Sequence, residues 1–190
     1  SMDMFPGYEI HSITNGVHHL TWSSPEMQAI FDRRSSGWRD DPSILASTCR
    51  DFEDGEVWQA HQAAKMRLIA EINRRTGIAF DAEILTIASA RRVVSYKQPE
   101  LLYENLERLA TLCQGRVQIV HSGNAHPSDP FAQGVIQRMV ERSRRLRDRV
   151  KIAYLENYNP DLARLLVQGA DVWLNTPMRL HEASGTSGMK

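Results

Sequence analysis

The sequence predicts an α/β fold, a Rossmann-like parallel sheet with flanking helices, and three observations lead to it. Downstream of Gly77, short apolar runs alternate with stretches in which apolar residues recur every three or four positions. This alternation is typical of βαβ units, which build a parallel sheet through right-handed crossovers. The length of 190 residues suits one domain with an additional arm. The composition, 42% hydrophobic and 24% charged, is that of a chain that folds around a core.

Three consecutive segments make up the predicted organisation. They are a connecting segment over 1–22, a helical segment over 23–77, and Rossmann-like βα repeats over 78–190 that are expected to be truncated at the C-terminus. Ser24 followed by Pro25 is typical of a helix N-cap and first position, and a second short helix is expected to begin at 40–43. From 56 to 75, apolar residues recur at helical spacing until Gly77, which predicts a long amphipathic helix.

The βα repeats are expected to contain strands and helices in alternation before a final loop. Strands are predicted over 83–89, 117–121, 150–155 and 171–175. Helices are predicted over 99–112, 131–149 and 160–168, the second with a basic outer face. Residues 182–190 are predicted to form a Gly/Ser loop that enters a helix.

Charge and cysteine usage exclude several classes of partner and site. Twenty-three basic residues balance 23 acidic ones, so the chain has no net field to attract nucleic acid or an anionic membrane. No apolar stretch approaches the roughly 20 residues of a membrane span. Cys49 and Cys113 show neither disulfide nor metal spacing, which favours reduced thiols in a cytoplasmic protein. No metal is predicted, because zinc-site order is missing around the histidines, His18, His19, His121 and His126.

Four polar loops follow the predicted strands. They cover 90–97, 122–127, 156–160 and 176–190, and all carry groups that bind sugars or phosphates. Because ligands of open parallel sheets bind beyond the carboxyl ends of the strands, these loops form the candidate site. The small residues of 182–190 would let the backbone approach an anion or a sugar hydroxyl closely. Gly/Ser content by itself favours an ordinary loop.

Ordered motifs in these loops resemble a known family. Residues 182–190, Glu-Ala-Ser-Gly-Thr-Ser-Gly-Met-Lys, are similar to the E-A-S-G-T-(S/G)-(G/N)-M-K signature of the α-glucan phosphorylases, retaining glycosyltransferases of the two-domain GT-B fold. Three further segments agree in the same order, namely T-N-G-V at 14–17, R-R-x-x-x-Y-K at 91–97 and L-E-N-Y at 155–158. The resemblance runs from about residue 12 to the end, and it implies part of the C-terminal lobe of a larger two-lobed enzyme.

The resemblance implies roles for the cations of these motifs. Lys190 matches the lysine that holds pyridoxal 5′-phosphate as a Schiff base, and Arg91 and Gly188 match positions around that cofactor. Arg92 and Lys97 match the family's catalytic residues, which hold the substrate phosphate. In this family the phosphate group of the cofactor relays a proton to inorganic phosphate. Only four of the 23 basic residues are lysines, so finding two of them in motifs is informative.

A glucosyl site is also implied by the resemblance. Positions that hydrogen-bond the hydroxyls of the transferred unit are matched by Asn15, Tyr96, Glu182, Ala183, Ser184 and Gly185. The implied enzyme cleaves the terminal α-1,4 bond of a glucan or maltodextrin with inorganic phosphate and releases α-glucose 1-phosphate with retention. The resemblance is compatible with a homodimeric parent protein. The 190 residues alone are expected to be inactive, because catalysis requires both lobes to close around the substrate.

Three residues depart from the family pattern, and two other functions remain open. Gln98, Asn124 and Met178 each stand where a cation is common, which puts the strength of phosphate binding in question. One alternative is a nucleotide-sugar-dependent GT-B glycosyltransferase similar to glycogen synthase. Such enzymes typically carry E-x7-E, whereas Glu182 is followed at that spacing by Lys190, which favours a phosphorylase. The other alternative is a non-catalytic domain that binds sugar or phosphate.

Overall fold

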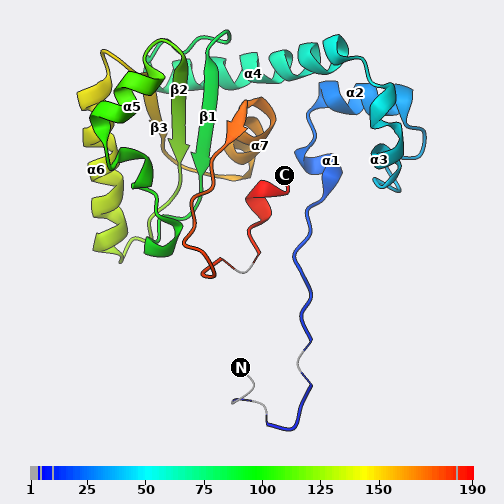
Figure 1. Cartoon of the computed structure of the whole chain (residues 1–190), viewed down its shortest axis with the longest axis horizontal. Coiled ribbons are helices and arrows are strands. Elements are labelled where there is room, and N and C mark those ends of the chain that lie inside the picture. The colour runs from blue at the N-terminus through cyan, green and yellow to red at the C-terminus, as the bar shows by residue number, and fades with distance from the viewer. Residues whose placement is uncertain (1–3, 5, 10, 183) are drawn as a thin grey trace.

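The computed structural model describes residues 4, 6–9, 11–182 and 184–190. A parallel sheet with helices on both faces forms one end of the molecule, and a small helical arm forms the other (Figure 1). The long helix α4, Asp54–Thr76, joins the two, and the N-terminal segment extends away from both (Figure 1). The predicted α/β class with a parallel sheet is confirmed.

The arm consists of short helices around one buried tryptophan. Its elements are α1 (His19–Trp22), α2 (Pro25–Arg34), α3 (Ile44–Thr48) and a 3-10 turn at Cys49–Asp51. The predicted cap of α2 is confirmed, since the Ser24 hydroxyl accepts a hydrogen bond from the amide of Met27 at 3.2 Å. Trp38 packs edge-on against Phe31 with ring centroids 5.0 Å apart, and its indole N–H donates to Asp32 at 2.8 Å. The arm therefore has a small core of its own.

Helix α4 buries one face and ends at the predicted glycine. Its buried side chains include Ala60, Ala64, Leu68 and Ile72, which recur at the spacing of one helix face. Gly77 ends the helix in a left-handed conformation with φ of +68°. The exposed positions of α4 carry both charged and uncharged residues, among them Arg74, Arg75, Trp58 and Met66. No helix in the described part of the chain is long and apolar enough to cross a membrane.

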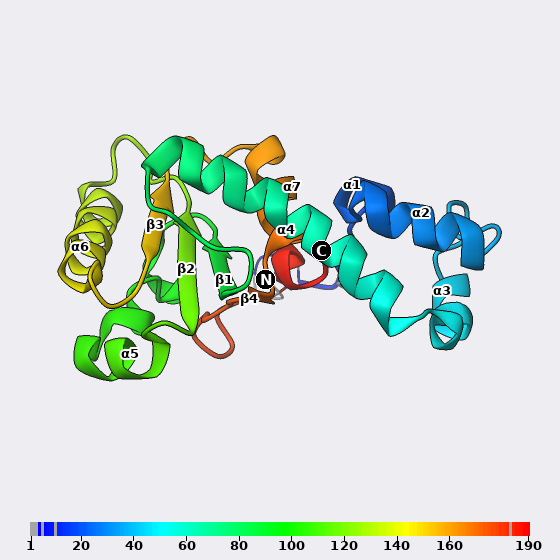
Figure 2. The same cartoon turned by 90° about the horizontal axis from the view of Figure 1, so that it is seen from above.

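The sheet has four parallel strands in the order β3-β2-β1-β4. They are β1 (Leu85–Ala90), β2 (Val117–Ser122), β3 (Ile152–Leu155) and β4 (Val172–Trp173). Along β2 successive side chains point to opposite faces of the sheet and enter two separate cores. Ile119 packs on one face with α5 (Leu106–Cys113) and α6 (Pro130–Leu146). Val120 packs on the opposite face with α4 and α7 (Pro160–Gly169). Figure 2 shows the sheet from above, with α4 and α5 on opposite sides of it. Because all strands are parallel, their carboxyl ends lie along one edge.

Two predicted helices differ in the structure. The helix expected over 99–112 is confirmed only from Leu106, and it is preceded by 3-10 turns at Ser95–Lys97 and Leu101–Tyr103. Asn105 sets the boundary, because its side chain caps the helix by accepting from the amide of Arg108 at 2.9 Å. No helix follows the loop of 182–190, where the described residues form only a 3-10 turn at Thr186–Gly188. Glycine, serine and threonine fill 184–188, and these residues have low helix propensity.

Candidate functional site

The candidate site lies at the carboxyl edge of the sheet. The loops after β1, β2 and β4 meet there, and the last segment of the chain folds back beneath the end of β1 (Figure 1). Parallel strands point their carboxyl ends the same way, so loops that are far apart in the sequence become neighbours. The predicted site residues come from these loops and from the N-terminal segment.

Arg91 immediately follows β1 and turns toward the β4 loop. Its guanidinium donates to the carbonyl of Leu174 at 2.9 Å and to the side-chain oxygen of Asn175 at 2.6 Å. Burial lowers the pKa of the Arg91 guanidinium, although the group stays charged at neutral pH. The two acceptors are uncharged, so Arg91 holds a partly buried positive charge without a direct carboxylate partner in the described residues.

Gly123 allows the loops after β1 and β2 to approach each other. A Cβ at this position would lie 2.1 Å from the carbonyl oxygen of Arg91, closer than any real contact. Its φ of +154° is also one that side-chain-bearing residues rarely adopt. The glycine therefore fixes the backbone position from which the Arg91 side chain projects.

Asn175 connects Arg91 to the final segment, and sequence reasoning missed it. Its side-chain oxygen accepts from the Arg91 guanidinium and also from the hydroxyl of Ser187 at 3.2 Å. Gly188 lies against the same amide, since a Cβ there would come 3.3 Å from the Asn175 side-chain nitrogen. Arg91 and the Thr186–Gly188 turn are thus held together through one residue. The signal available in the sequence was the position of Asn175 at the exit of a strand.

Lys97 pairs with Glu182 across the site. The ammonium lies 2.9 Å from the carboxylate oxygen, and the two side chains are only 15% and 22% exposed. The same ammonium lies 5.4 Å from the centre of the Tyr96 ring. The backbone of this turn is held by the β4 loop, because the amide of Met178 donates to the carbonyl of Tyr96 at 2.7 Å. A residue proposed for phosphate and one proposed for sugar are therefore in direct contact.

Asn15 brings the N-terminal segment to the final segment. Its side-chain amide donates to the backbone carbonyl of Ser184 at 3.2 Å, across 169 residues of chain. Gly185 lies against Glu182, whose side-chain carbons would be 3.5 and 3.7 Å from a Cβ on the glycine. Ala183, also predicted for the sugar site, lies outside the described residues. Four of the predicted sugar residues are thus linked in two neighbouring pairs.

Lys190 and Arg92 differ in their surroundings. The Lys190 ammonium lies 3.7 Å from the centre of the Trp22 ring, and burial lowers the pKa of the ammonium. Trp22 lies in the motif region near the N-terminus, but the sequence did not indicate this contact. Arg92 is exposed and has no hydrogen bond or ion pair to the described part of the chain. It lies between β1 and the 3-10 turn at Ser95–Lys97, which is called the Lys97 turn below.

The departures from the family pattern lie at the same edge. Gln98 adopts a left-handed conformation with φ of +46°, and the Asn124 side chain donates to the carbonyl of Tyr158 at 3.0 Å. Met178 is 43% exposed. Even with these positions uncharged, the predicted site residues include four cations, Arg91, Arg92, Lys97 and Lys190, and one carboxylate, that of Glu182. The arrangement suits an anion next to a group rich in hydroxyls.

Comparisons with known proteins agree with this chemistry. Residues 2–190 match the family described as carbohydrate phosphorylase. The chain is 34% identical to a glycogen phosphorylase of Aquifex aeolicus and 38% identical to a maltodextrin phosphorylase of Thermococcus litoralis, in each case over 95% of its length. It is 33% identical to a glycogen phosphorylase of Mycobacterium tuberculosis over the same share. The chain spans only 30%, 24% and 23% of these three relatives.

Proposed function

Because the chain belongs to the carbohydrate phosphorylase family, we propose that it supplies the phosphate, sugar and cofactor sites of an α-glucan phosphorylase. The observation that carries this proposal is the meeting of Arg91, Lys97 and Glu182 with the 184–190 segment at one sheet edge. The relatives are three to four times longer than the matched region, so the complete activity belongs to a polypeptide that holds both lobes.

Inorganic phosphate binds to Arg92 and Lys97 in this proposal. A guanidinium offers a planar pair of donors and an ammonium offers a compact charge, and together they offset the repulsion between two phosphate groups. Arg92 is exposed and available, whereas Lys97 must exchange its contact with Glu182 for the phosphate. Binding of phosphate therefore releases the carboxylate of Glu182.

The glucosyl unit binds beside the phosphate. Its hydroxyls are read by Asn15, Tyr96, Glu182, Ala183, Ser184 and Gly185. Once Lys97 turns to phosphate, the Glu182 carboxylate is free to accept hydrogen bonds from sugar hydroxyls. Such a site discriminates against deoxy sugars, because a missing hydroxyl leaves buried polar groups without partners.

The residues present also fit pyridoxal 5′-phosphate. Lys190 offers an amine whose pKa is lowered by burial, so a larger fraction is uncharged and able to react with an aldehyde. Arg91 offers a partly buried guanidinium without a carboxylate partner in the described residues, and Gly188 lies within reach of the same Asn175 side chain. When bound, the cofactor supplies a phosphate group that passes a proton to the substrate phosphate. Arg91 and the 186–188 turn hold that group in place.

The proposed reaction transfers a glucosyl unit from a glucan to phosphate. The bond between the anomeric carbon and the leaving glucan oxygen breaks, that oxygen receives a proton from the substrate phosphate, and an oxygen of the same phosphate bonds to the anomeric carbon. The product is α-glucose 1-phosphate, with retained configuration. The cations around phosphate hold its charge next to the developing positive charge of the sugar. We place this reaction in the cytoplasm, in a homodimeric parent protein, with the isolated 190 residues inactive.

The experiment measures the α-glucose 1-phosphate formed from maltodextrin and inorganic phosphate. The enzyme tested is a polypeptide as long as the relatives, in which this chain occupies the matching region. Lys190→Ala is expected to abolish product, and Lys151→Ala, at the opposite edge of the sheet, is expected to leave it unchanged. Glucose transfer from a nucleotide sugar with no phosphorolysis would contradict the proposal and favour the glycogen synthase-like alternative. Product formation by Lys190→Ala would also contradict it.

A further inference from the structure

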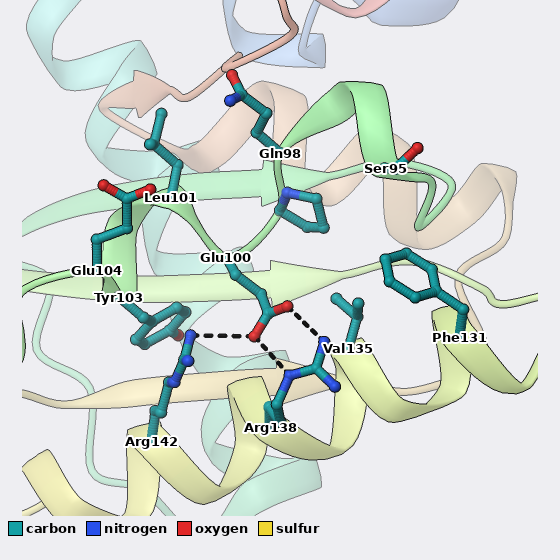
Figure 3. Close-up of a pocket in the computed structure, with 11 residues that line it drawn as sticks. Ser95, Gln98, Glu100, Leu101, Tyr103, Glu104, Phe131, Val135, Arg138 and Arg142 are labelled. Atoms are coloured by element: carbon teal, nitrogen blue, oxygen red, sulfur yellow. Dashed lines mark hydrogen bonds and ion pairs between the residues drawn. The ribbon is translucent and has the colours of Figure 1, made fainter.

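Glu100 follows the Lys97 turn by three residues and links this part of the chain to helix α6. Its carboxylate accepts from Arg138 at 2.6 and 2.9 Å and from Arg142 at 3.0 Å, both on α6 (Figure 3). Arg138 binds in a two-pronged geometry, which is the stronger arrangement for a guanidinium and a carboxylate. The hydrogen bond from Arg138 holds the pKa of Glu100 below its usual value, so the carboxylate is charged at neutral pH.

The triad spans a cavity. A hollow of about 390 Å³ lies between the turn and α6, lined in part by Ser95, Gln98 and Phe131 (Figure 3). Within the described part of the chain, the bonds to Glu100 are the hydrogen bonds that join residues 95–104 to α6. Tyr103 also packs in the apolar core to which Val135 and Met139 of α6 belong. The segment is therefore held on this side by apolar packing at Tyr103 and by ion pairs at Glu100, the residue nearer to Lys97.

The opposite side of the turn is held by the β4 loop. The Thr176 hydroxyl lies 3.2 and 3.3 Å from the carbonyls of Lys97 and Gln98, and the amide of Met178 donates to Tyr96. The left-handed Gln98 lies between these contacts and Glu100. A non-glycine residue in this conformation persists only when its surroundings hold it there. The turn is thus clamped from two directions, and the Glu100 triad is one of the clamps.

We propose that Glu100, through Arg138 and Arg142, is a positioning residue that holds the Lys97 turn ready to bind phosphate. The proposal rests on the phosphate role proposed for Lys97. Removing the Glu100 carboxylate distinguishes a positioning role from a purely electrostatic one, because the removal adds net positive charge near the site. Charge alone would then strengthen phosphate binding, whereas loss of positioning weakens it.

The test titrates the 190-residue chain with inorganic phosphate and follows the phosphorus NMR signal. Glu100→Gln and Arg138→Gln are each expected to weaken phosphate binding, by roughly fivefold, the size of a partly exposed two-pronged ion pair. The double variant is expected to be no weaker than the worse single variant, because both changes remove the same contact. The matched control is Glu107→Gln on α5, which removes a carboxylate bound to Arg149 and is expected to change affinity less than about twofold.

Hydrogen exchange separates this inference from the proposed function. In Glu100→Gln the amides of Lys97, Gln98 and Leu101, all hydrogen-bonded within the turn, are expected to exchange faster, while the β1 amides stay protected. Unchanged phosphate affinity, or tighter binding by Glu100→Gln, would overturn the positioning role. If the unmutated chain bound no phosphate, the phosphate role of Lys97 would fail by itself. The exchange rates would then decide whether Glu100 holds the turn, and unchanged rates would overturn the inference.

Discussion

The ion pair between Lys97 and Glu182 leads to a prediction with an unusual sign. The ammonium and the carboxylate are 2.9 Å apart, and their side chains are 15% and 22% exposed. The pair is therefore more buried than a typical surface ion pair, but it is not fully buried. In the proposed function, phosphate displaces Glu182 from Lys97 in order to bind. A pair of this exposure is worth about 1 kcal/mol, the upper end for exposed pairs, which corresponds to about fivefold in affinity. Glu182→Gln is therefore expected to tighten phosphate binding by up to about fivefold.

The assay is the same phosphate titration of the 190-residue chain, with Glu104→Gln as the control. Glu104 is an exposed carboxylate after the same turn and has no ion-pair partner among the residues that the structure describes. Both variants change the net charge equally, so a difference between them reports the contact with Lys97. Unchanged or weaker phosphate binding by Glu182→Gln, or equal tightening by both variants, would refute the reasoning.

Four further substitutions test stability, measured by urea unfolding. Gly169→Ala, whose Cβ would lie 2.7 Å from the Cβ of Leu68, is expected to lower the free energy of unfolding, by about 1–3 kcal/mol. Gly55→Ala, with open space around it, is expected to raise that energy, by up to about 1 kcal/mol. Gly123→Ala is expected to cost about 2 kcal/mol or more, because it displaces the Arg91 backbone. Complete burial lowers the pKa of His121 to about 4 from 6.5, so the unfolded chain binds the proton first. Stability is then lost as pH falls from about 6.5 to about 4, by up to about 3 kcal/mol, and His121→Asn lacks this loss.

Each of these stability predictions has a result that would contradict it. Equal effects of the alanine substitutions at Gly169 and Gly55 would mean that α7 and α4 are not in close contact. An unchanged free energy of unfolding for Gly123→Ala would mean that the two loops can separate at no cost. Parallel pH dependence of the original chain and His121→Asn would mean that the buried imidazole is not the group that titrates.

The sequence predicted the layers of the fold well because burial leaves a local pattern. Residues 117–121 contain the β-branched residues Val117, Ile119 and Val120, and the strand occurs at Val117–Ser122. Gly77 ends α4 as predicted, since a left-handed end has few alternatives to glycine. The 3-10 turn at Ser95–Lys97 lies in a predicted loop, and the turn at Leu101–Tyr103 lies where a helix was predicted because leucines recur at helical spacing over 101–109. Their geometry is set by contacts from Thr176 and from α6, which lie far away in the sequence.

The candidate site was predictable only where a motif marked it. Arg91, Lys97 and Glu182 stand in motifs, and the structure brings all three to the same edge. Asn175 and Glu100 stand outside those motifs, and their importance comes from distances across the fold. Sequence spacing does not show that one asparagine joins Arg91 to Ser187, because these residues are neighbours only after the sheet has formed.

The most direct test of the central claim is to find where pyridoxal 5′-phosphate attaches. The chain is incubated with the cofactor, the product is fixed by borohydride reduction, and the modified peptide is identified by mass spectrometry. The chain has four lysines, of which Lys65 is buried against Asp171 at 2.7 Å and Lys97 is paired with Glu182. We expect one adduct, on Lys190, that is absent from Lys190→Ala. Equal labelling of Lys151 and Lys190, or labelling that spares Lys190, would contradict it.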